Sequence, residues 1–396
     1  MKKIFPVILI CILFTACNEN KTIKVFIKND SSIDRENEII ELEWSDITAK
    51  TALADTARII VIDANGMQVP YQLVTEGNAT PQKLIFPVSV KAEKSAEYLI
   101  KKGIPQNFTA KTFGRFVPER KDDVAWENDK IAFRMYGPAL IAIDGPSNGI
   151  DVWVKKTENL IIDKWYKDDL SGVASYHVDH GEGVDCYKVG RTLGAGGMAP
   201  FVNDSLWLSE NFVTQKVLDN GPLRTTIELT YKAFDVAGDS TIAETKIISL
   251  DAGSNFNKII ENYSGVKSVI PVAAGIILKT ANAAPVNDVK EADPAYKPVS
   301  EAEKGFIAYA ETADKADPQD DNGIVYTAVV FSGALKKTET AQKHVLAVTD
   351  YNPGENLVYY AGAGWSKGGF ATEKEWYDYV EKFAAKLRSP LTIIIQ

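Results

Sequence analysis

Cysteine and histidine are scarce in this chain, with three of each in 396 residues. The repeated His or Cys spacings that predict a zinc site are therefore missing. We expect Cys11 and Cys17 to lie in an N-terminal leader and at its cleavage point, which leaves Cys186 without a second cysteine for an intramolecular disulfide. We expect an exported protein without disulfides, whose stability comes from burial of a hydrophobic core.

Long apolar runs, phosphate-binding motifs and excess positive charge are also lacking. After the leader, no apolar run is long enough to span a membrane. The glycine-rich stretch 190–197 lacks the Gly-Lys-Ser/Thr of a P-loop, so it predicts a loop or active-site rim and no nucleotide. The formal net charge is −9 and becomes −11 without Lys2 and Lys3, which disfavours nucleic acid and anionic lipid surfaces as partners.

The first residues have the pattern of a processed export signal. Lys2 and Lys3 precede an apolar run from Ile4 to Thr15, and the run ends at Cys17 in a sequence similar to a bacterial lipobox. We expect residues 1–16 to be a lipoprotein signal peptide and residues 17–22 a tether. Acylation of Cys17 would anchor the protein to a membrane of the bacterial cell envelope, on the periplasmic face or the outer surface.

The remaining chain alternates in the manner of β-strands separated by turns. Short strands predict a small β-sandwich over residues 23–105, and a larger antiparallel β-rich domain follows over residues 106–396. Regular intervening helices are missing, which argues against a parallel α/β fold. A capping box at Thr372 and Glu375 predicts one C-terminal amphipathic helix, expected to pack on the sandwich edge, with a closing strand after Pro390. The predicted class is all-β.

Residues 176–188 concentrate groups that transfer protons. If this segment is a strand, His177 and Asp179 share one face while His180 points away. His177, Tyr176 and Glu182 are candidate catalytic residues, and Asp179 is a candidate substrate ligand. No metal is expected, although Asp179 and Asp185 could hold calcium as an alternative. A further alternative is a loop without a functional role, in which the histidines only cap backbone groups. Cys186 is expected to be buried and inert.

A second dense stretch lies upstream and supplies cations and aromatic rings. Arginines can clamp a carboxylate, and exposed aromatic faces stack on sugar rings. Arg120 and Arg134 are therefore candidate catalytic cations, and Tyr166 is a candidate acid. The candidate substrate-binding residues are Arg115, Glu119, Trp126, Tyr136, Trp165 and Arg191.

Several of these segments resemble a known family. They are Phe113 to Arg120, Trp126 to Leu140, the segment around His177, and Ala361 to Ser366. Together they resemble an exported family catalogued as domain of unknown function 4861, over nearly the whole mature chain. The resemblance implies a galactose-mutarotase-like β-supersandwich, a fold shared by aldose epimerases, polysaccharide-lyase domains and glycosidase domains. It also implies carbohydrate use near uronic-acid glycans, but it supplies no catalytic residues.

The leading functional hypothesis is a carbohydrate-active enzyme acting on uronate-containing oligo- or polysaccharide, most concretely a β-eliminating lyase. Arg120 or Arg134 would neutralise the uronate, His177 would take the C5 proton, and Tyr166 or Tyr176 would protonate the leaving oxygen. Hydrolysis by a carboxylate pair, drawn from Glu182, Asp179, Glu119 and Glu127, is the competitor. Sugar epimerisation and a non-catalytic glycan-binding lipoprotein remain open. No cofactor is expected.

Overall fold

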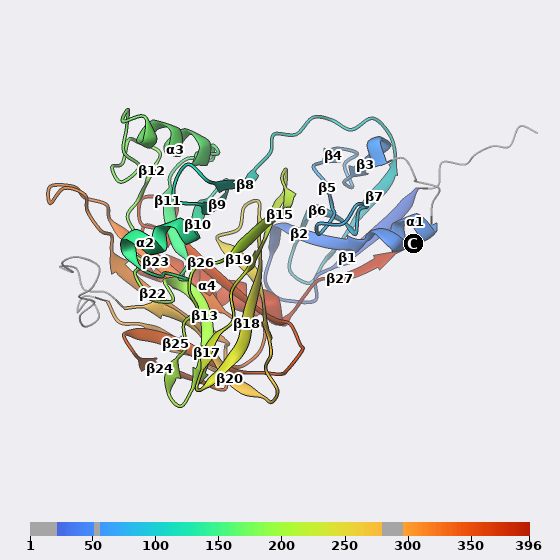
Figure 1. Cartoon of the computed structure of the whole chain (residues 1–396). Helices are drawn as coiled ribbons and strands as arrows, with labels where there is room; N and C mark the ends of the chain where they lie inside the picture. Colours follow the sequence, from blue (N-terminus) through green and yellow to red (C-terminus); the bar gives the residue numbers. More distant parts are fainter. Residues whose placement is uncertain (1–21, 51–55, 279–295) are drawn as a thin grey trace, which may run out of the picture.

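The computed structural model describes residues 22–50, 56–278 and 296–396, and its named strand pairs are antiparallel (Figure 1). The predicted lipoprotein signal peptide and Cys17 lie outside these residues. In the described part of the chain, no helix is both long and apolar enough to cross a membrane.

The N-terminal unit is a small sandwich of two sheets. The first sheet, in spatial order, contains β27 (Thr392–Ile395), β1 (Ile23–Lys28), β7 (Ser95–Lys102), β3 (Ile59–Ile62) and β4 (Gln68–Val69). The second contains β2 (Arg35–Glu43), β6 (Lys83–Val90) and β5 (Gln72–Val74). Alternate residues such as Val25, Ile27, Leu42 and Phe86 form the shared core. The predicted small sandwich is confirmed.

The larger unit packs one wide sheet against two narrower sheets. The wide sheet contains β15 (Thr214–Asn220), β16 (Arg224–Thr230), β18 (Asp239–Asp251), β19 (Phe256–Ser264), β26 (Leu357–Trp365), β23 (Ile324–Val330), β22 (Phe306–Thr312) and β21 (Val299–Glu301), with β17 (Phe234–Val236) beside β18. One narrow sheet contains β14 (Ser205–Leu206), β13 (Ala195–Val202), β20 (Ile270–Ile277), β25 (His344–Tyr351) and β24 (Lys337–Ala341). The other contains β12 (Gly183–Asp185), β11 (Asp151–Lys155), β10 (Ile131–Met135), β9 (Asp123–Asn128) and β8 (Thr112–Val117). A continuous apolar core joins the three sheets, so the predicted all-β class is confirmed.

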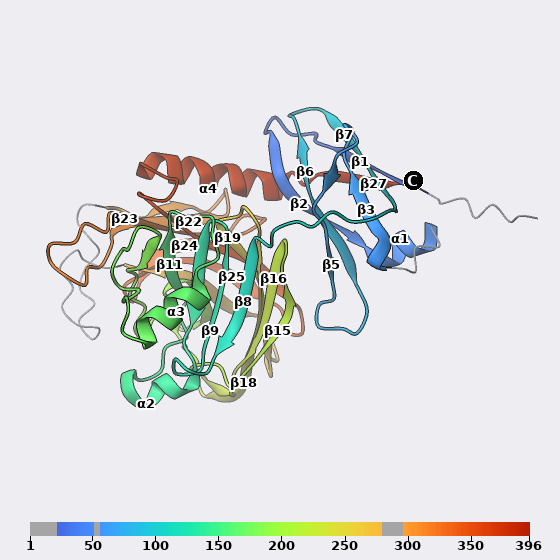
Figure 2. The ribbon, with the colours of Figure 1, turned by 90° about the horizontal axis from the view of Figure 1, so that it is seen from above.

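Helices cover the outer faces of this larger unit (Figure 2). The described helical segments are α1 (Trp44–Lys50), η1 (Thr56–Arg58), η2 (Pro138–Leu140), α2 (Ile141–Asp144), α3 (Ile162–Leu170) and α4 (Glu373–Arg388). The predicted capping box begins α4, where Thr372 accepts from the backbone of Glu375. The apolar stripe of α4, including Trp376 and Val380, packs on the face of the wide sheet rather than on its edge. The residues of α3 cover the outer face of the β8–β12 sheet.

The structure refines two expectations from the sequence. The closing strand β27 pairs with β1, so the chain returns from the large unit to the small one, although the sequence had placed it in the 106–396 domain. The glycine-rich stretch 190–197 is a loop through residue 194, as one of the two alternatives predicted, and its last three residues begin β13. At Gly194 (φ +60°) an added Cβ would lie 2.3 Å from the carbonyl oxygen of Ile150, so close backbone packing requires glycine there.

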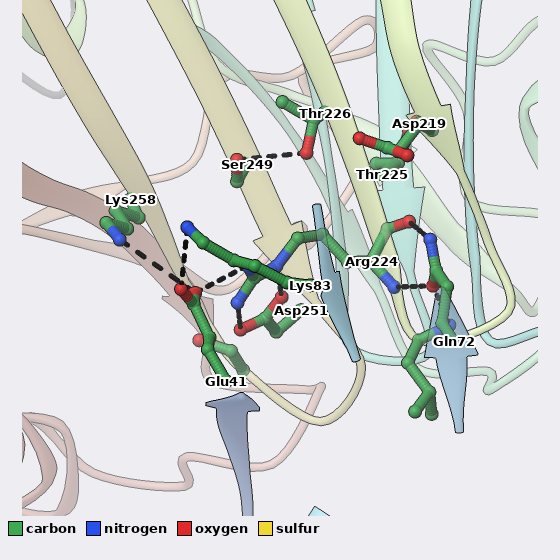
Figure 3. A network of polar contacts seen from close by, with 12 residues as sticks. Glu41, Gln72, Lys83, Asp219, Arg224, Thr225, Thr226, Ser249, Asp251 and Lys258 are labelled. Atoms are coloured by element: carbon green, nitrogen blue, oxygen red, sulfur yellow. Dashed lines mark hydrogen bonds and ion pairs between the residues drawn. The ribbon is translucent and has the colours of Figure 1, made fainter. Parts of the chain in front are cut away.

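A polar network fixes the small unit against the large one (Figure 3). Arg224 on β16 donates from Nη1 to Glu41 Oε1 at 2.6 Å and binds both oxygens of Asp251 at 2.5 and 2.8 Å. The side-chain amide of Gln72 donates to the Arg224 carbonyl at 3.0 Å and accepts from the Leu223 and Arg224 amides at 2.8 Å. Because each polar group is satisfied, the interface has a defined orientation.

Candidate functional site

The candidate site is a row of polar side chains across one end of the β8–β12 sheet. Arg134 on β10 lies opposite Asp151 on β11, and Asp185 ends the neighbouring strand β12. Arg134 donates from Nε to Asp151 Oδ2 at 2.7 Å and from Nη2 to Asp185 Oδ2 at 2.8 Å. All three side chains are buried. Arg134 is the shared cation of both carboxylates, which offsets part of the cost of burying their charges.

Aromatic rings surround the Arg134 guanidinium. The Cζ atom of Arg134 lies 4.9 Å from the ring centroid of Tyr136, 5.0 Å from that of Trp153 and 5.8 Å from that of Tyr176. Tyr176 in turn stacks on Trp153 with ring centroids 4.8 Å apart. Ring faces attract cations, so this arrangement holds both the guanidinium and Tyr176 in place.

His177 stands at the surface end of this row, with 51% of its side chain exposed. Its Nδ1 lies 3.5 Å from Asp185 Oδ2 and 3.3 Å from the Asp185 carbonyl oxygen. Its ring contacts Tyr176 at a centroid distance of 4.6 Å. Within the described residues, His177 Nε2 has no protein partner. An exposed imidazole with one nitrogen beside a buried carboxylate has the arrangement of an oriented general base.

Arg120, in the turn between β8 and β9, joins the same cluster. Its Nε donates to the Tyr176 hydroxyl at 3.4 Å, and its Nη1 lies 3.4 Å from Asp123 Oδ2. The side chain is 22% exposed, although its Nη1 atom is buried. The two dense stretches of the sequence therefore meet in space. The catalytic roles assigned to these residues stay predictions.

Burial shifts the acidity of the carboxylates in this cluster. Burial raises the pKa of Asp185 to about 6, with Arg134 and His177 opposing that rise and Asp151 adding to it. Burial also raises the pKa of Asp123, against the attraction of Arg134 and Arg120. A carboxylate whose pKa lies near that of an ordinary imidazole can respond to the charge state of the histidine beside it.

The space beside Tyr176 is small. A hollow of about 40 Å³ lies between α3 and the 174–183 segment, and its lining includes Trp165, Tyr176, His180 and Glu182. It has room for a few water molecules but not for a sugar ring. A sugar would therefore have to lie over the exposed side of His177 and Arg120.

Several aromatic residues predicted to stack on sugars are core residues instead. Trp126 is fully buried and donates from Nε1 to Asn257 Oδ1 at 2.7 Å. Tyr166, predicted as a catalytic acid, is also fully buried and cannot contact a substrate, while Trp165 is 7% exposed and packs on Trp153. Tyr136 is half-buried, and its hydroxyl donates to Asp151 at 3.1 Å. The predicted contact of Trp126 with a sugar was therefore wrong, because the side chain of this strand residue faces the core rather than solvent.

The segment 176–182 is a series of turns and not the strand that its alternation suggested. Gly181 and Gly183 have φ of +99° and +137°, values outside a regular strand. Asp179 turns away from His177, accepts from the Gly181 amide at 2.8 Å and pairs with Lys156 at 2.7 Å. The prediction that His177 and Asp179 converge was therefore wrong, and Asp185 takes that place.

The other predicted residues are distributed around the site. Arg115 pairs with Glu119 at 2.7 Å and with Asp163 of α3 at 2.6 Å. Glu182 pairs with Lys164 at 2.5 Å, and His180 contacts the carbonyl oxygen of Ser175 at 3.1 Å as a backbone cap. Arg191 is exposed and lines a separate hollow with Trp207 and Lys232. Cys186 is buried, as predicted.

The two residues named for the calcium alternative have separate ion-pair partners. Asp179 and Asp185 are held by different cations, Lys156 and Arg134. Over residues 22–50, 56–278 and 296–396, no group of three or more His, Cys, Asp or Glu side chains is arranged to hold a metal ion.

Asp151 and Asp123 are the members of the cluster that the sequence analysis missed. Both begin a strand whose every residue is buried. The available signal was the pattern of residues 151–155, in which Asp151, Trp153 and Lys155 alternate with valines. A charged residue on a buried strand needs a partner of opposite charge on the neighbouring strand. Arg134 is that partner for Asp151.

Comparisons with known proteins place the chain in a family. The sequence matches the family described as "Domain of unknown function (DUF4861)" over residues 27–393. "Uncharacterized protein P7" of Formosa agariphila is 32% identical over 401 residues, which cover 97% of this chain and 96% of that protein.

Solved structures give weaker similarities. A protein in glycosyl hydrolase family 38 from Enterococcus faecalis is 12% identical, with a TM-score of 0.49 over 96% of this chain and 48% of its own. An alpha-mannosidase from Enterococcus faecalis V583 is 11% identical, with a TM-score of 0.46 over 95% of this chain and 46% of its own. This chain thus spans about half the length of those solved chains. The extent of the family match and of the alignment with the Formosa protein shows that the chain belongs to the DUF4861 family.

Proposed function

We propose that this protein is a carbohydrate-active enzyme that cleaves uronate-containing oligo- or polysaccharides by β-elimination. The observation that carries the proposal is the position of His177, an exposed imidazole between the Tyr176 ring and the buried Asp185 carboxylate. Arg120 lies against the hydroxyl of the same tyrosine. A cation and a base therefore adjoin at the protein surface, and both contact the side chain of Tyr176, which is itself 5% exposed.

Each of these side chains has a distinct role in the proposed reaction. Arg120 would pair with the uronate carboxylate and so make the neighbouring C5 proton more acidic. His177 Nε2 would take that proton, the bond from C4 to the leaving oxygen would break, and a C4–C5 double bond would form. The Tyr176 hydroxyl would return a proton to the leaving oxygen, which balances the step.

Arg134 has a positioning role in this proposal. It is buried and therefore does not touch a substrate, unlike the role assigned to it from the sequence. Its contact with Asp185 holds that carboxylate beside His177 Nδ1. Asp185 would then stabilise the imidazolium that forms when His177 takes the proton.

The states of the other carboxylates favour elimination over hydrolysis. A hydrolytic general acid needs a raised pKa and access to the glycosidic oxygen. Hydrogen bonds from Arg115 and Lys164 lower the pKa of Glu119 and Glu182 respectively. Partial burial acts to raise the pKa of Asp179, but Lys156 and nearby amides outweigh it and the pKa is lowered.

Glu127, the remaining candidate for hydrolysis, is buried beneath α3. It pairs with Lys155 at 2.6 Å and accepts from the Ile161 and Ile162 amides at 2.7 and 2.8 Å. This carboxylate supports the start of α3 and has no exposed face for a substrate.

We also propose that the protein acts at the cell envelope, anchored through a lipid on Cys17. The support is the lipobox-like sequence that ends at that cysteine. Metabolic labelling with a fatty-acid analogue would test the anchor. Labelling of the natural protein and its loss in Cys17→Ser are the expected results, and labelling that survives the substitution would contradict the anchor.

The elimination reaction has a direct spectroscopic signature. Each cleavage creates a double bond conjugated to the uronate carboxylate, which absorbs in the ultraviolet. The protein would be incubated with pectic, ulvan and glucuronoxylan-type polysaccharides, and absorbance would be followed over time. Growth of the absorbance with at least one of them is expected, and silence across the panel would contradict the proposal.

A further inference from the structure

A wide groove lies between the small sandwich and the large unit, away from His177. Its lining residues come from β2 of the small unit, from β16, β18, β19 and β26 of the wide sheet, and from the last turns of α4. Its volume is about 820 Å³, within the range of ligand-binding pockets. None of the residues of the His177 cluster lines it.

The acidic side chains of this groove all have cationic partners within the protein. On the β2 wall, Asp34 pairs with Lys91 at 2.8 Å and Glu38 pairs with Arg35 at 2.9 Å. Glu36 also pairs with Lys91, at 3.4 Å. Glu41 and Asp251 pair with Arg224 at 2.6 and 2.5 Å (Figure 3). The acidic wall therefore has little free charge to offer a cationic ligand.

The helical wall carries cations that are not matched. Lys382 and Lys386 of α4 both line the groove, and no carboxylate of the described residues lies within 4.0 Å of either ammonium group. Lys386 is half-buried, and burial together with the nearby Arg35 and Lys382 lowers its pKa against the longer-range attraction of Glu38. A partly buried ammonium without a contacting counter-ion is destabilised, and an anionic ligand would relieve that cost.

Aromatic rings lie between these lysines and the sheet. Phe383 stacks on Phe256 with centroids 4.2 Å apart, and Tyr360 meets the edge of Phe383 at 5.3 Å. Tyr360 and Phe383 are half-buried, so each keeps part of its ring at the groove. Ser249 and Ser254 add hydroxyl groups to the same lining. Aromatic faces beside hydroxyls suit sugar rings, which have apolar C–H faces and polar edges.

We infer that this groove between the two units binds a glycan chain that carries acidic groups. The lysines of α4 would pair with the acidic groups, and Tyr360 and Phe383 would contact the sugar rings. Ring carboxylates and sulfate esters share this chemistry, and the test below separates them. The inference concerns binding and stands independently of the elimination proposed at His177.

Isothermal titration calorimetry on the full mature chain would test this inference. His177→Ala would serve as the background, because an uncleaved probe is needed if the proposed reaction occurs. The probes are oligogalacturonate for carboxylates, carrageenan oligosaccharide for sulfates, cello-oligosaccharide as a neutral chain, and polyglutamate as an acidic chain without sugars. We expect at least one acidic glycan to bind, with an affinity that falls as salt rises.

Variants of α4 and β26 would locate the binding. Lys382→Ala with Lys386→Ala should weaken acidic-glycan binding by about tenfold or more and reduce its salt dependence. Tyr360→Ala should weaken it by a few-fold, roughly the effect of losing one ring contact, with the salt dependence kept. Lys374→Ala is the matched control, because Lys374 lies on the same helix, pairs with Asp378 at 2.6 Å and does not line the groove.

Three outcomes would overturn the assignment of acidic-glycan binding to the groove. They are unchanged affinity in the double lysine variant, no binding of either acidic glycan, and equally tight binding of polyglutamate. Circular dichroism would confirm that each variant is folded. The elimination assay is a separate measurement: loss of elimination with binding retained would contradict only the function proposed at His177.

Discussion

Two buried arginines organise this molecule, and their surroundings differ in one instructive way. Arg224 at the interface between the units bonds through Nε and both terminal nitrogens, and it binds both oxygens of Asp251. Arg134 in the β8–β12 sheet bonds to Asp151 and Asp185, but its buried Nη1 makes no hydrogen bond within the described part of the chain. The first network is complete and the second is not.

The acidities of the carboxylates follow the same division. Burial acts to raise the pKa of Glu41, but Arg224 and Lys258 outweigh it and hold the pKa at about 2. Burial raises the pKa of Asp185 to about 6 despite Arg134. A satisfied network with a firmly ionised carboxylate is typical of a structural joint. A buried carboxylate with a raised pKa beside an exposed histidine is typical of a site that does chemistry.

The largest expected change is in the stability of an Arg134→Met variant. Asp151 and Asp185 have side chains only 0% and 2% exposed, so neither can recover hydration when its cation is lost. Leaving buried charges uncompensated should lower the free energy of unfolding by about 3–5 kcal/mol. Chemical denaturation followed by tryptophan fluorescence would measure it, and a loss below about 1 kcal/mol would show that the cluster is more hydrated than its burial indicates.

The same substitution at Arg224 should cost less. Glu41 and Asp251 are 27% and 26% exposed, so water can solvate both when the guanidinium is removed. We expect Arg224→Met to lower the free energy of unfolding by about 1–3 kcal/mol. If Arg224→Met cost as much as Arg134→Met in the same denaturation experiment, exposure of the carboxylates would not be the deciding difference.

The two clusters should also respond to pH with opposite signs. The pKa of Glu41 is lowered from 4.5 to about 2 on folding, so its contribution to stability is present above pH 4.5 and lost as the pH falls towards 2. The pKa of Asp185 is raised from 3.8 to about 6, so its contribution is present below pH 3.8 and lost as the pH rises through 6.

Glu41→Gln and Asp185→Asn isolate these contributions. Unfolding free energies of the parent and both variants would be measured between about pH 3 and 7. The deficit of Glu41→Gln should shrink as the pH falls below about 4.5, because the parent then loses the same charge. Asp185→Asn should gain on the parent as the pH rises from about 4 to 6. Parallel pH curves for a variant and the parent would refute the shift assigned to that residue.

The smallest expected effect is at Asp179, which the sequence analysis placed in substrate binding. The structure gives this residue a partly exposed pair with Lys156 and a backbone contact at Gly181. Such pairs contribute little, so Asp179→Asn should change the free energy of unfolding by about 1 kcal/mol or less and leave activity close to the parent. A severalfold rise in KM with unchanged stability would restore the substrate-binding role.

More of the fold than of the site could be predicted from the sequence, because the alternation of apolar and polar residues along a strand indicates directly which side chains are buried. The strands around Val25, Phe133 and Ile248 alternate as their packing requires, and the capping box at Thr372 marked α4. The pairing of β27 with β1 was missed, since no local pattern specifies which distant strand is the partner. The helix α3 was missed because its first residues, Ile161 and Ile162, are held by the buried Glu127 rather than by a local cap.

At the candidate site, residue types were predicted better than residue geometry. Arg120, Tyr176 and His177 meet as expected, because scarce titratable residues clustered in two segments. Alternation failed at Asp179, where Gly181 and Gly183 turn the chain. Composition also did not distinguish Trp126, buried in the core, from an exposed aromatic ring, because that distinction depends on which sheet face meets another layer.

The central claim is that His177 acts as a base and that the Arg134 cluster positions it through Asp185. The most direct test compares the unmutated protein, His177→Gln and His180→Gln by ultraviolet absorbance on the uronate polysaccharide that gives the fastest reaction. His180 is the matched control, because it lies in the same segment and caps the backbone at Ser175. We predict a rate loss of about 10²–10⁴ in His177→Gln and a near-parental rate in His180→Gln. Equal rates in all three proteins would contradict the claim.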